Sequence, residues 1–296
     1  MTDLVIRPLT AGEEHLFHAL ADPDLVGRAA FGERYSVDEY RPEWTWIALR
    51  DGAVVARAAW WGRPDDNKPI ALDWFDFTDP AAGTELLRAA PFHTEYELRL
   101  PSGWRDDPAL RGEGQRRIDA AVAAGMSVLV ERFRYRWTPD CGLPDRPGRL
   151  EFRPEPDDQV ILDVLRRIGD GSLDAHTRQA RAETDPVTAA QQELDLLRGL
   201  PSPREWWLLG YAPDGDLVGI TVPARNPYDP IVGFVGVLPE HRGNGYAYDL
   251  LVECTHRLVA EGADRIVAAT DQPNLPMAAA FARAGYPIEM ERIDLL

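Results

Sequence analysis

Lysine is almost absent from this sequence: Lys68 is the only one, and arginine supplies nearly all of the positive charge. Acidic residues outnumber basic ones by 49 to 32, so the formal net charge is -17 at pH 7. Nucleic acids and anionic membranes carry the same sign and are repelled at long range, so we expect neither as a partner. An amine substrate, in contrast, is a cation at neutral pH and suits this charge balance.

Cysteine and long apolar segments are scarce too. Cys141 and Cys254 are the only cysteines and have no metal-ligand spacing, so we expect neither a metal site nor a disulfide framework. No run reaches the roughly 18 apolar residues of a membrane span, and no basic segment followed by an apolar stretch opens the chain. These absences predict a cytoplasmic protein. We expect a monomer or a homodimer.

The chain is long enough for two domains of ordinary size, with 296 residues of which 45% are hydrophobic. Residues 138–148 contain three prolines and two glycines, which indicates a linker. The order of expected elements before this segment recurs after it, at a period of about 145 residues. We therefore predict a duplicated domain, with one copy at residues 1–148 and the other at residues 149–296.

Alternation, helical periodicity and turn residues give the expected elements of each half. A Thr10–Glu13 capping box starts a predicted helix, and Asp-Gly turns at residues 51–52 and 214–215 predict hairpins. In the first half, strands are expected at residues 3–9, 44–49, 53–61, 70–77, 92–100 and 126–137, with helices at 10–20 and 108–124. In the second half, strands are expected at residues 150–153, 206–212, 217–223, 231–238, 265–270 and 286–296, with helices at 157–168, 186–198, 246–261 and 274–284 and a break at 169–176.

The most informative stretch lies at residues 231–249. An apolar run bounded by Pro230 and Pro239 predicts a buried strand, and Gly243 and Gly245 then lead into a helix. Glycine lets backbone N–H groups approach an anion closely, and the first N–H groups of a helix are unpaired and electropositive. The turn can therefore hold a phosphate mainly by its main chain, with Arg242 adding charge. On the glycines alone, an ordinary strand-to-helix junction is the favoured interpretation.

The full spacing favours a specific family. The segment Arg242-Gly243-Asn244-Gly245-Tyr246-Ala247 resembles the Arg/Gln-x-x-Gly-x-Gly/Ala pyrophosphate loop of the GNAT N-acetyltransferase superfamily. Residues 274–286, which run from an asparagine through Phe281 to a Gly-Tyr pair, are similar to that superfamily's Asn-x-x-Ala-x-x-Leu-Tyr-x-x-x-Gly-Phe segment. Neither a Walker loop nor a dinucleotide fingerprint fits. The resemblance therefore points to acetyl-coenzyme A as the cofactor.

The resemblance also implies a fold. The chain looks like a tandem GNAT protein of the kind that includes mycothiol synthase, with an α/β fold of the α+β mixed-sheet type. Each domain would be a twisted, mostly antiparallel sheet flanked by helices, with a splay between the fourth and fifth strands. The first copy has no pyrophosphate loop at residues 78–88 and is expected to be degenerate, which leaves one cofactor site per chain.

By the same resemblance, several residues would contact the cofactor. They are Phe234, Val235, Gly236 and Val237 for the pantetheine arm, Arg242, Gly243, Asn244, Gly245, Tyr246 and Ala247 for the pyrophosphate, and Asn274 and Phe281 near the thioester. Phe281 stands where many members have the tyrosine that protonates the leaving thiolate, and phenylalanine has no proton to give. The candidates to replace it, each with packing as the simpler alternative, are Tyr228, Tyr246, Tyr248 and Tyr286.

A general base matters because an alkylamine is almost fully protonated at pH 7. Asp174 and His176 are the first candidates, since the superfamily builds the roof of the acceptor pocket from this segment, and Asp271 follows. Asp174 is equally interpreted as a helix cap, and Asp271 as a loop residue. We also consider whether Asp73, Asp76, His93, Glu95 and Glu97 of the first domain form an acidic wall for an amine.

These observations predict an acetyl-coenzyme A-dependent N-acyltransferase of class EC 2.3.1. It would acetylate a primary amine of a small molecule by direct attack on the thioester, without a covalent enzyme intermediate. One alternative is a mycothiol-synthase-like acetylation of a glucosaminyl amine. Another is a module that binds acyl-coenzyme A without turnover, which the phenylalanine at position 281 favours.

Overall fold

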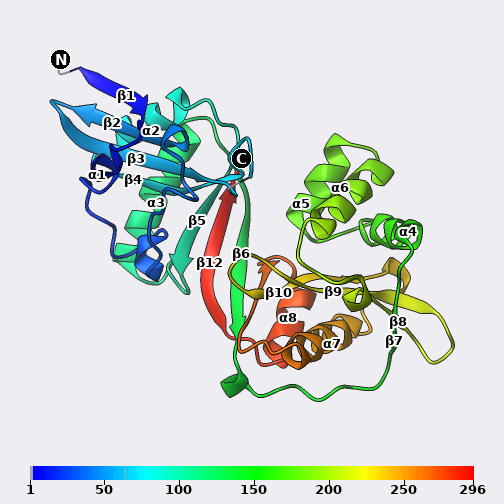
Figure 1. Ribbon diagram of the computed structural model, residues 1–296. Helices are drawn as coiled ribbons and strands as arrows, with labels where there is room; N and C mark the ends of the chain where they lie inside the picture. Colours follow the sequence, from blue (N-terminus) through cyan, green and yellow to red (C-terminus); the bar gives the residue numbers. More distant parts are fainter. Residues whose placement is uncertain (1–2, 64) are drawn as a thin grey trace. The chain divides into compact units, whose positions relative to one another are not determined.

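The computed structural model describes residues 3–63 and 65–296, which form the expected mixed α/β fold. The chain divides into two compact units (Figure 1). Unit 1 contains Met1–Arg132 and Met290–Leu296, and unit 2 contains Phe133–Glu289. Among the described residues, no helix is long and apolar enough to cross a membrane.

Unit 1 is built on an antiparallel sheet with one parallel step. Strands β1 to β4 pair antiparallel in sequence, β4 and β5 pair parallel, and β5 pairs antiparallel with β12. The elements of the first half are β1 (Leu4–Pro8), α1 (Glu14–Phe17), η1 (Ala29–Phe31), η2 (Pro42–Trp44), β2 (Thr45–Arg50), β3 (Ala53–Trp61), β4 (Ala71–Phe77), α2 (Pro80–Ala89), β5 (Glu95–Pro101), α3 (Pro108–Ala123) and β6 (Val128–Trp137), and β12 (Ile288–Leu295) lies almost entirely in unit 1. Aromatic residues fill the cores on both faces, with Trp60 and Phe75 in one cluster and Phe17 and Trp74 in the other.

Unit 2 repeats this order. Strands β7 to β10 pair antiparallel in sequence, and β10 and β11 pair parallel. Its elements are η3 (Pro139–Cys141), β7 (Glu151–Pro154), α4 (Asp158–Ile168), α5 (Ala175–Glu183), α6 (Pro186–Arg198), η4 (Arg204–Trp206), β8 (Leu208–Tyr211), β9 (Leu217–Arg225), β10 (Pro230–Val237), η5 (Pro239–His241), α7 (Tyr246–Ala260), β11 (Ile266–Asp271) and α8 (Leu275–Arg283). Helices α4 and α6 cover one face of the sheet, and α7 and α8 cover the other (Figure 1).

The predicted boundary between residues 148 and 149 differs from the one in the structure, because the last strand belongs to unit 1. Residues of β12 from Met290 to Leu295 pair with β5 in antiparallel register, from Pro101 back to Tyr96. Strand β6, the last strand of the first half, continues into unit 2, where β11 is its neighbour. The alternating pattern correctly predicted both strands. It contained no information on which half each would join.

The helix predicted at residues 10–20 is wrong over most of its length, since α1 has four residues. The Glu13 carboxylate does accept from the Thr10 N–H at 2.9 Å. However, the buried Arg57 guanidinium donates to the carbonyls of Phe17 at 2.8 Å and Leu20 at 2.9 Å. A longer helix would need these carbonyls for its own hydrogen bonds, so it ends early.

Helix α5 was not predicted, because residues 169–176 were expected to be a break. The Asp174 side chain caps its first turn, but the helix has almost no apolar face and Ala175 is its only buried residue. Hydrophobic periodicity is the main signal for a helix in a sequence, and it is missing here. The helix packs instead against α6 at a position set by its capped end.

Candidate functional site

The site begins with two strands of unit 2 that separate. The parallel strands β10 and β11 pair at one position, Ile231 with Val267. On the opposite edge of β10, the register with β9 shifts between Val232 and Phe234, which indicates a β-bulge that bends the strand. Beyond the bulge, the main chain of β10 is open toward β11. This is the splay expected between the fourth and fifth strands.

A cavity of about 520 Å³ lies at this splay, within the usual size range of small-molecule sites. Its walls come from β10, the glycine turn, the first turn of α7, helix α8 and the connection between α4 and α5. The lining residues are Ile168, Gly171, Ser172, Leu173, Val235, Gly236, Val237, Arg242, Gly243, Gly245, Tyr246, Ala247, Tyr248, Asn274, Pro276, Met277, Ala279, Ala280 and Arg283.

The glycine turn opens one end of this cavity onto the N-terminus of α7. Gly243 has φ 81° and Gly245 has φ 75°, a backbone conformation that favours glycine. Gly245 is the N-cap residue of α7, and no side chain caps this helix. The other long helices of unit 2 are capped by Asp157, Asp174, Asp185 and Asn274. The uncapped N–H groups and the helix dipole therefore form a site for an anion.

Arg242, which was expected to add charge at a pyrophosphate, lines the cavity and bonds main-chain carbonyls. Its guanidinium donates to the carbonyls of Ile168 at 2.6 Å, Asp170 at 2.6 Å and Gly171 at 3.1 Å, at the C-terminal end of α4. It also donates to the Val237 carbonyl at 3.2 Å. Burial lowers the pKa of Arg242 from its ordinary value. The side chain thus lines the cavity while it ties the α4–α5 connection to the glycine turn.

A second arginine, Arg149, supports the turn from the other side, and the sequence did not point to it. Its guanidinium donates to the carbonyls of Asn244 at 3.0 Å and Gly245 at 3.2 Å, and it pairs with the buried Asp249 of α7. It also lies 4.8 Å from the centre of the Tyr246 ring. The hydrogen bond to Asp249 raises the pKa of Arg149. Because Arg149 bonds the carbonyls of the turn, the backbone N–H groups of the turn remain available to a ligand.

Residues 174–286 match the family model described as the acetyltransferase (GNAT) family. This segment of unit 2 is therefore similar to the GNAT acetyltransferases. No curated protein matches the sequence significantly. The matched segment covers the glycine turn, both separating strands and α8, so the match and the cavity identify the same part of unit 2.

Three solved structures share the fold over nearly the whole chain. A GCN5-related N-acetyltransferase from Sphaerobacter thermophilus matches with 15% identity and a TM-score of 0.58, over 99% of this chain and 94% of that one. A tandem GNAT protein from the clavulanic acid biosynthesis pathway matches with 17% identity and a TM-score of 0.52, over 99% and 98%. A fungal GCN5-related glucosamine N-acetyltransferase region within a multi-domain β-N-acetylglucosaminidase matches with 14% identity and a TM-score of 0.55, over 100% and 38%. At these identities the likeness concerns the fold.

Most, but not all, of the predicted cofactor residues line the cavity of unit 2. Phe234, Asn244 and Phe281 are outside the lining, whereas Asn274 is part of it and caps α8 by accepting from the Met277 N–H at 3.3 Å. Gly236 is needed for packing, since a Cβ there would come within 2.7 Å of Ile168. The close contact between β10 and Ile168 in the cavity wall therefore requires glycine at position 236.

Phe281 belongs to the core of unit 2. Its ring is 1% exposed, stacks on Tyr135 with centroids 4.2 Å apart and meets Tyr286 edge-on at 5.3 Å. Tyr286 is also buried, its hydroxyl bonds to Thr255 at 2.7 Å, and burial raises its pKa, so it is poorly placed as an acid. Of the four tyrosine candidates, Tyr246 and Tyr248 line the cavity, and Tyr228 is 52% exposed and lies outside the lining.

The carboxylates predicted as bases hold the N-terminus of α5. Asp174 accepts from the Thr177 N–H at 2.8 Å and its hydroxyl at 3.0 Å, which is the capping role given above as the alternative. Asp271, buried at the end of β11, accepts from the Ala175 N–H at 2.6 Å. Both charges are therefore stabilised at a helix N-terminus. His176 follows in the first turn of α5, half-buried, and none of the three candidates lines the cavity.

Glu193 on α6 joins this group and was missed from the sequence. Burial, together with the nearby Asp174 charge, raises the pKa of Glu193 to about 7, and His176 opposes this shift. Asp174, His176 and Glu193 thus lie within electrostatic reach of one another beside the α4–α5 connection. No motif marks Glu193, because its position depends on how α5 packs on α6.

In unit 1, the corresponding gap between β4 and β5 is filled by the chain itself. The Gly27 N–H donates to the Arg99 carbonyl of β5 at 2.8 Å, and the next residue, Arg28, pairs with Asp73 of β4. Helix α2, which corresponds to α7, is capped by the carboxylate of Asp79, 3.0 Å from the Ala81 N–H. The carboxylate of Asp79 thus occupies the helix N-terminus at which an anionic ligand would bind.

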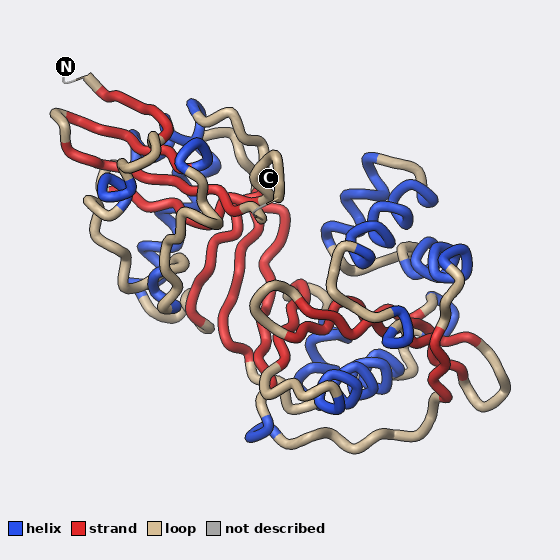
Figure 2. The backbone as a smooth tube through the Cα atoms, in the orientation of Figure 1, coloured by secondary structure: helices blue, strands red, loops and turns tan. Residues whose placement is uncertain are grey.

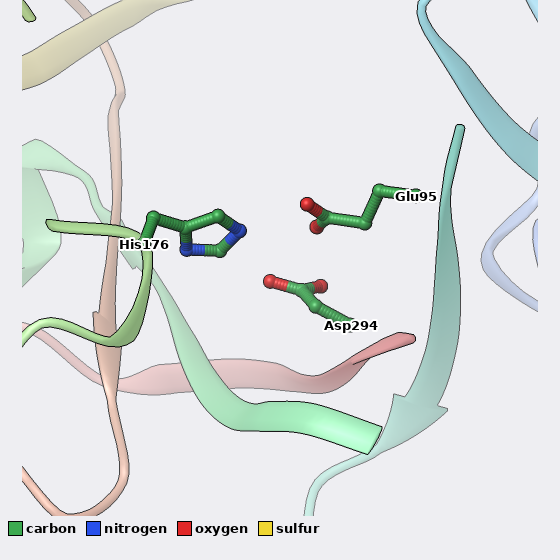
Figure 3. Close-up of side chains that lie close together, drawn as sticks. All are labelled: Glu95, His176 and Asp294. Carbon is green, nitrogen blue, oxygen red and sulfur yellow. The ribbon is translucent and has the colours of Figure 1, made fainter. Parts of the chain in front are cut away.

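Three buried acidic residues of unit 1, Asp73, Asp76 and Asp294, are paired with arginines. Asp76 accepts from Arg57 at 3.0 Å and from Arg117 at 3.0 Å. Figure 3 shows Glu95 of β5 and Asp294 of β12 beside each other, and Arg292 bonds Asp294 at 2.8 Å. These contacts make the sheet of unit 1 a network of opposite charges. Asp73 and Asp76 therefore do not form the uncompensated acidic wall that was considered above for an amine.

Proposed function

We propose that this protein is an acetyl-coenzyme A-dependent N-acyltransferase that acts on a primary amine of a small molecule. One observation carries the proposal: the uncapped N-terminus of α7 opens into a cavity of about 520 Å³ beside a strand whose edge is free. An amide-rich pantetheine can pair with such an edge as an added strand would. A pyrophosphate can bind the N–H groups after Gly243. The GNAT match supports this assignment.

Acetyl-coenzyme A bound there would supply an acetyl group as a thioester. The residues of the chain would position it: Val235 and Val237 along the strand edge, the glycine turn at the pyrophosphate, and Asn274 at the end of the splay. Free N–H groups of β10 can polarise the thioester carbonyl. Unit 1 would contribute no second cofactor site, because its gap and its helix end are filled by its own residues.

The acceptor must lose a proton before its nitrogen can attack. For an alkylamine with a pKa near 10.4, this costs about 4 to 5 kcal/mol at pH 7. We propose that the proton passes to the group around His176 and Glu193, directly or through water, while the C–N bond forms and the C–S bond breaks. Asp174 and Asp271 would hold α5 so that His176 keeps its position. Tyr246 and Tyr248 are the candidates to protonate the leaving sulfur, which can also leave as a thiolate.

Two other functions deserve a test. An amino sugar is a reasonable acceptor, since one structural neighbour is named a glucosamine N-acetyltransferase and the tandem order resembles that of mycothiol synthase. A binding module without turnover is the other, and the core position of Phe281 favours it because no hydroxyl is available there.

The test is release of free thiol from acetyl-coenzyme A over a panel of amines that includes glucosamine derivatives, with the full-length chain. Release with one class of amine supports the enzyme and identifies its acceptor. Tight binding of acetyl-coenzyme A in calorimetry with no release for any amine would support the module. A calorimetric stoichiometry of two per chain would contradict a single site in unit 2.

A further inference from the structure

Two arginines line the cavity, and only one of them, Arg242, has its guanidinium hydrogen-bonded to other residues that the structure describes. Arg242 bonds main-chain carbonyls, as described above, and holds the α4–α5 connection. Arg283, the last residue of α8, is exposed, and its guanidinium carbon lies 3.8 Å from the centre of the Tyr248 ring. Among residues 3–63 and 65–296, no carboxylate pairs with Arg283. Its positive charge is therefore available to a ligand in the cavity.

The charge of Arg283 lies beside the N-terminus of α7. Tyr248 is the third residue of α7, so a guanidinium stacked on its ring lies beside the first turn of that helix. The carboxylate of that turn, Asp249, is already bonded to Arg149. The uncapped N–H groups of α7 and the Arg283 guanidinium thus border the same end of the cavity with the same sign of charge.

In a simpler role, the positive charge of Arg283 would only stabilise α8 by interacting with the negative C-terminal end of the helix dipole. That role needs a basic residue in the last turn of α8, but it needs neither the cavity wall nor the stacking on Tyr248. Stacking holds the guanidinium plane against the ring and leaves its N–H edge free for a planar, two-pronged contact. Phosphate oxygens are suitable acceptors for such an edge.

We propose that Arg283 binds a phosphate group of the coenzyme A nucleotide and supplies the cation that Arg242 does not. This inference rests on the proposed function and adds a subsite to it. The chemistry fits any phosphate at that end of the molecule, the pyrophosphate or the 3′-phosphate. Comparison of coenzyme A with 3′-dephospho-coenzyme A distinguishes them.

The experiment measures the Kd of coenzyme A by calorimetry for the full-length protein and for Arg283→Gln, at several salt concentrations. One lost charge-assisted contact predicts binding that is about 10- to 100-fold weaker. The slope of log Kd against log salt should become shallower, because an ionic contact has been removed. Arg283→Lys should recover part of the affinity. With 3′-dephospho-coenzyme A, a small effect assigns the 3′-phosphate and a full effect assigns the pyrophosphate.

Arg153→Gln is the matched control. Arg153 is also exposed and lies 4.7 Å from the centre of a tyrosine ring, that of Tyr211, but it does not line the cavity. Its substitution should leave the Kd within twofold. An unchanged Kd in Arg283→Gln would overturn the inference, as would weaker binding with an unchanged salt slope, which indicates a structural effect. If the wild type itself fails to bind coenzyme A, the proposed function fails instead.

Discussion

Arg149 offers a direct test of how the glycine turn is organised. Residues 142–149 pass along α7 as a loop (Figure 2), with contacts from the Pro144 carbonyl to His256 at 2.7 Å and from Arg146 to Glu253 at 2.6 Å. At its end, Arg149 bonds the carbonyls of the turn and the buried Asp249. Arg149→Gln removes these contacts without touching the N–H groups that would bind phosphate.

The magnitude follows from the contacts that are lost. Two hydrogen bonds to Asn244 and Gly245 at a partly exposed site contribute about 1 to 2 kcal/mol together. If the turn then has to be ordered by the ligand, this amount is lost from binding. The Kd of coenzyme A should therefore rise about 5- to 30-fold. Calorimetry with the full-length chain measures this change.

Arg146→Gln is the control, because Arg146 also bonds a carboxylate of α7 but contacts no residue of the turn. Its side chain is 54% exposed and that of Arg149 is 42% exposed, so each substitution removes a partly exposed arginine from a carboxylate of α7. Arg146→Gln should bind coenzyme A like the wild type. If Arg149→Gln lowers the melting temperature but leaves the Kd unchanged, or if both variants lose equal affinity, the turn does not depend on Arg149.

Three further predictions concern the α5 group and the core. Asp174→Asn should preserve turnover, whereas Asp174→Ala should lower the free energy of unfolding by about 1 kcal/mol as a lost cap; loss of turnover in the Asn variant would show that Asp174 is the base. Burial raises the pKa of Glu193 from 4.5 to about 7. The contribution of this residue to the free energy of unfolding is therefore complete below about pH 4, where it is protonated, and is lost as the pH rises to 7. Glu193→Gln should therefore be more stable than wild type at pH 8, by about 2 to 3 kcal/mol in denaturant titrations, with no such difference at pH 4; equal stability at both pH values would contradict the raised pKa. Phe281→Tyr buries a hydroxyl in the core, so we expect about 1 to 3 kcal/mol of destabilisation and no gain in thiol release, and faster release would mean that the hydroxyl reaches the cavity.

Local signals in the sequence predicted the parts of the structure that depend on neighbouring residues. The Asp51–Gly52 hairpin formed as expected, since both residues have the positive φ that its turn requires. The strand, glycine turn and helix at residues 230–260 were predicted for the same reason, because backbone geometry at Gly243 and Gly245 is a local property. Asn274 as the cap of α8 is another example.

Contacts between distant residues were not predictable from these patterns. Arg242 bonds carbonyls about 70 residues earlier in the chain, and Arg149 bonds a turn about 95 residues later. Nothing in the local composition marks either pairing, since most arginines of this acidic chain have a carboxylate or carbonyl within reach. Glu193 is similar, because its raised pKa comes from packing against α5, a helix without an apolar stripe. The family resemblance identified the turn, but it did not reveal the residues that support it.

The place of β12 in unit 1 affects how the protein is made. Unit 1 needs residues 290–296, which emerge from the ribosome only after Phe133–Glu289 has been synthesised. At ordinary translation rates, that interval lasts on the order of 10 s. During that time, the edge of β5 that β12 later covers has unpaired N–H and C=O groups, which are a known aggregation risk. The first unit to be synthesised is thus the last to be completed, so slow elongation through the second half prolongs the period in which a chaperone must protect it.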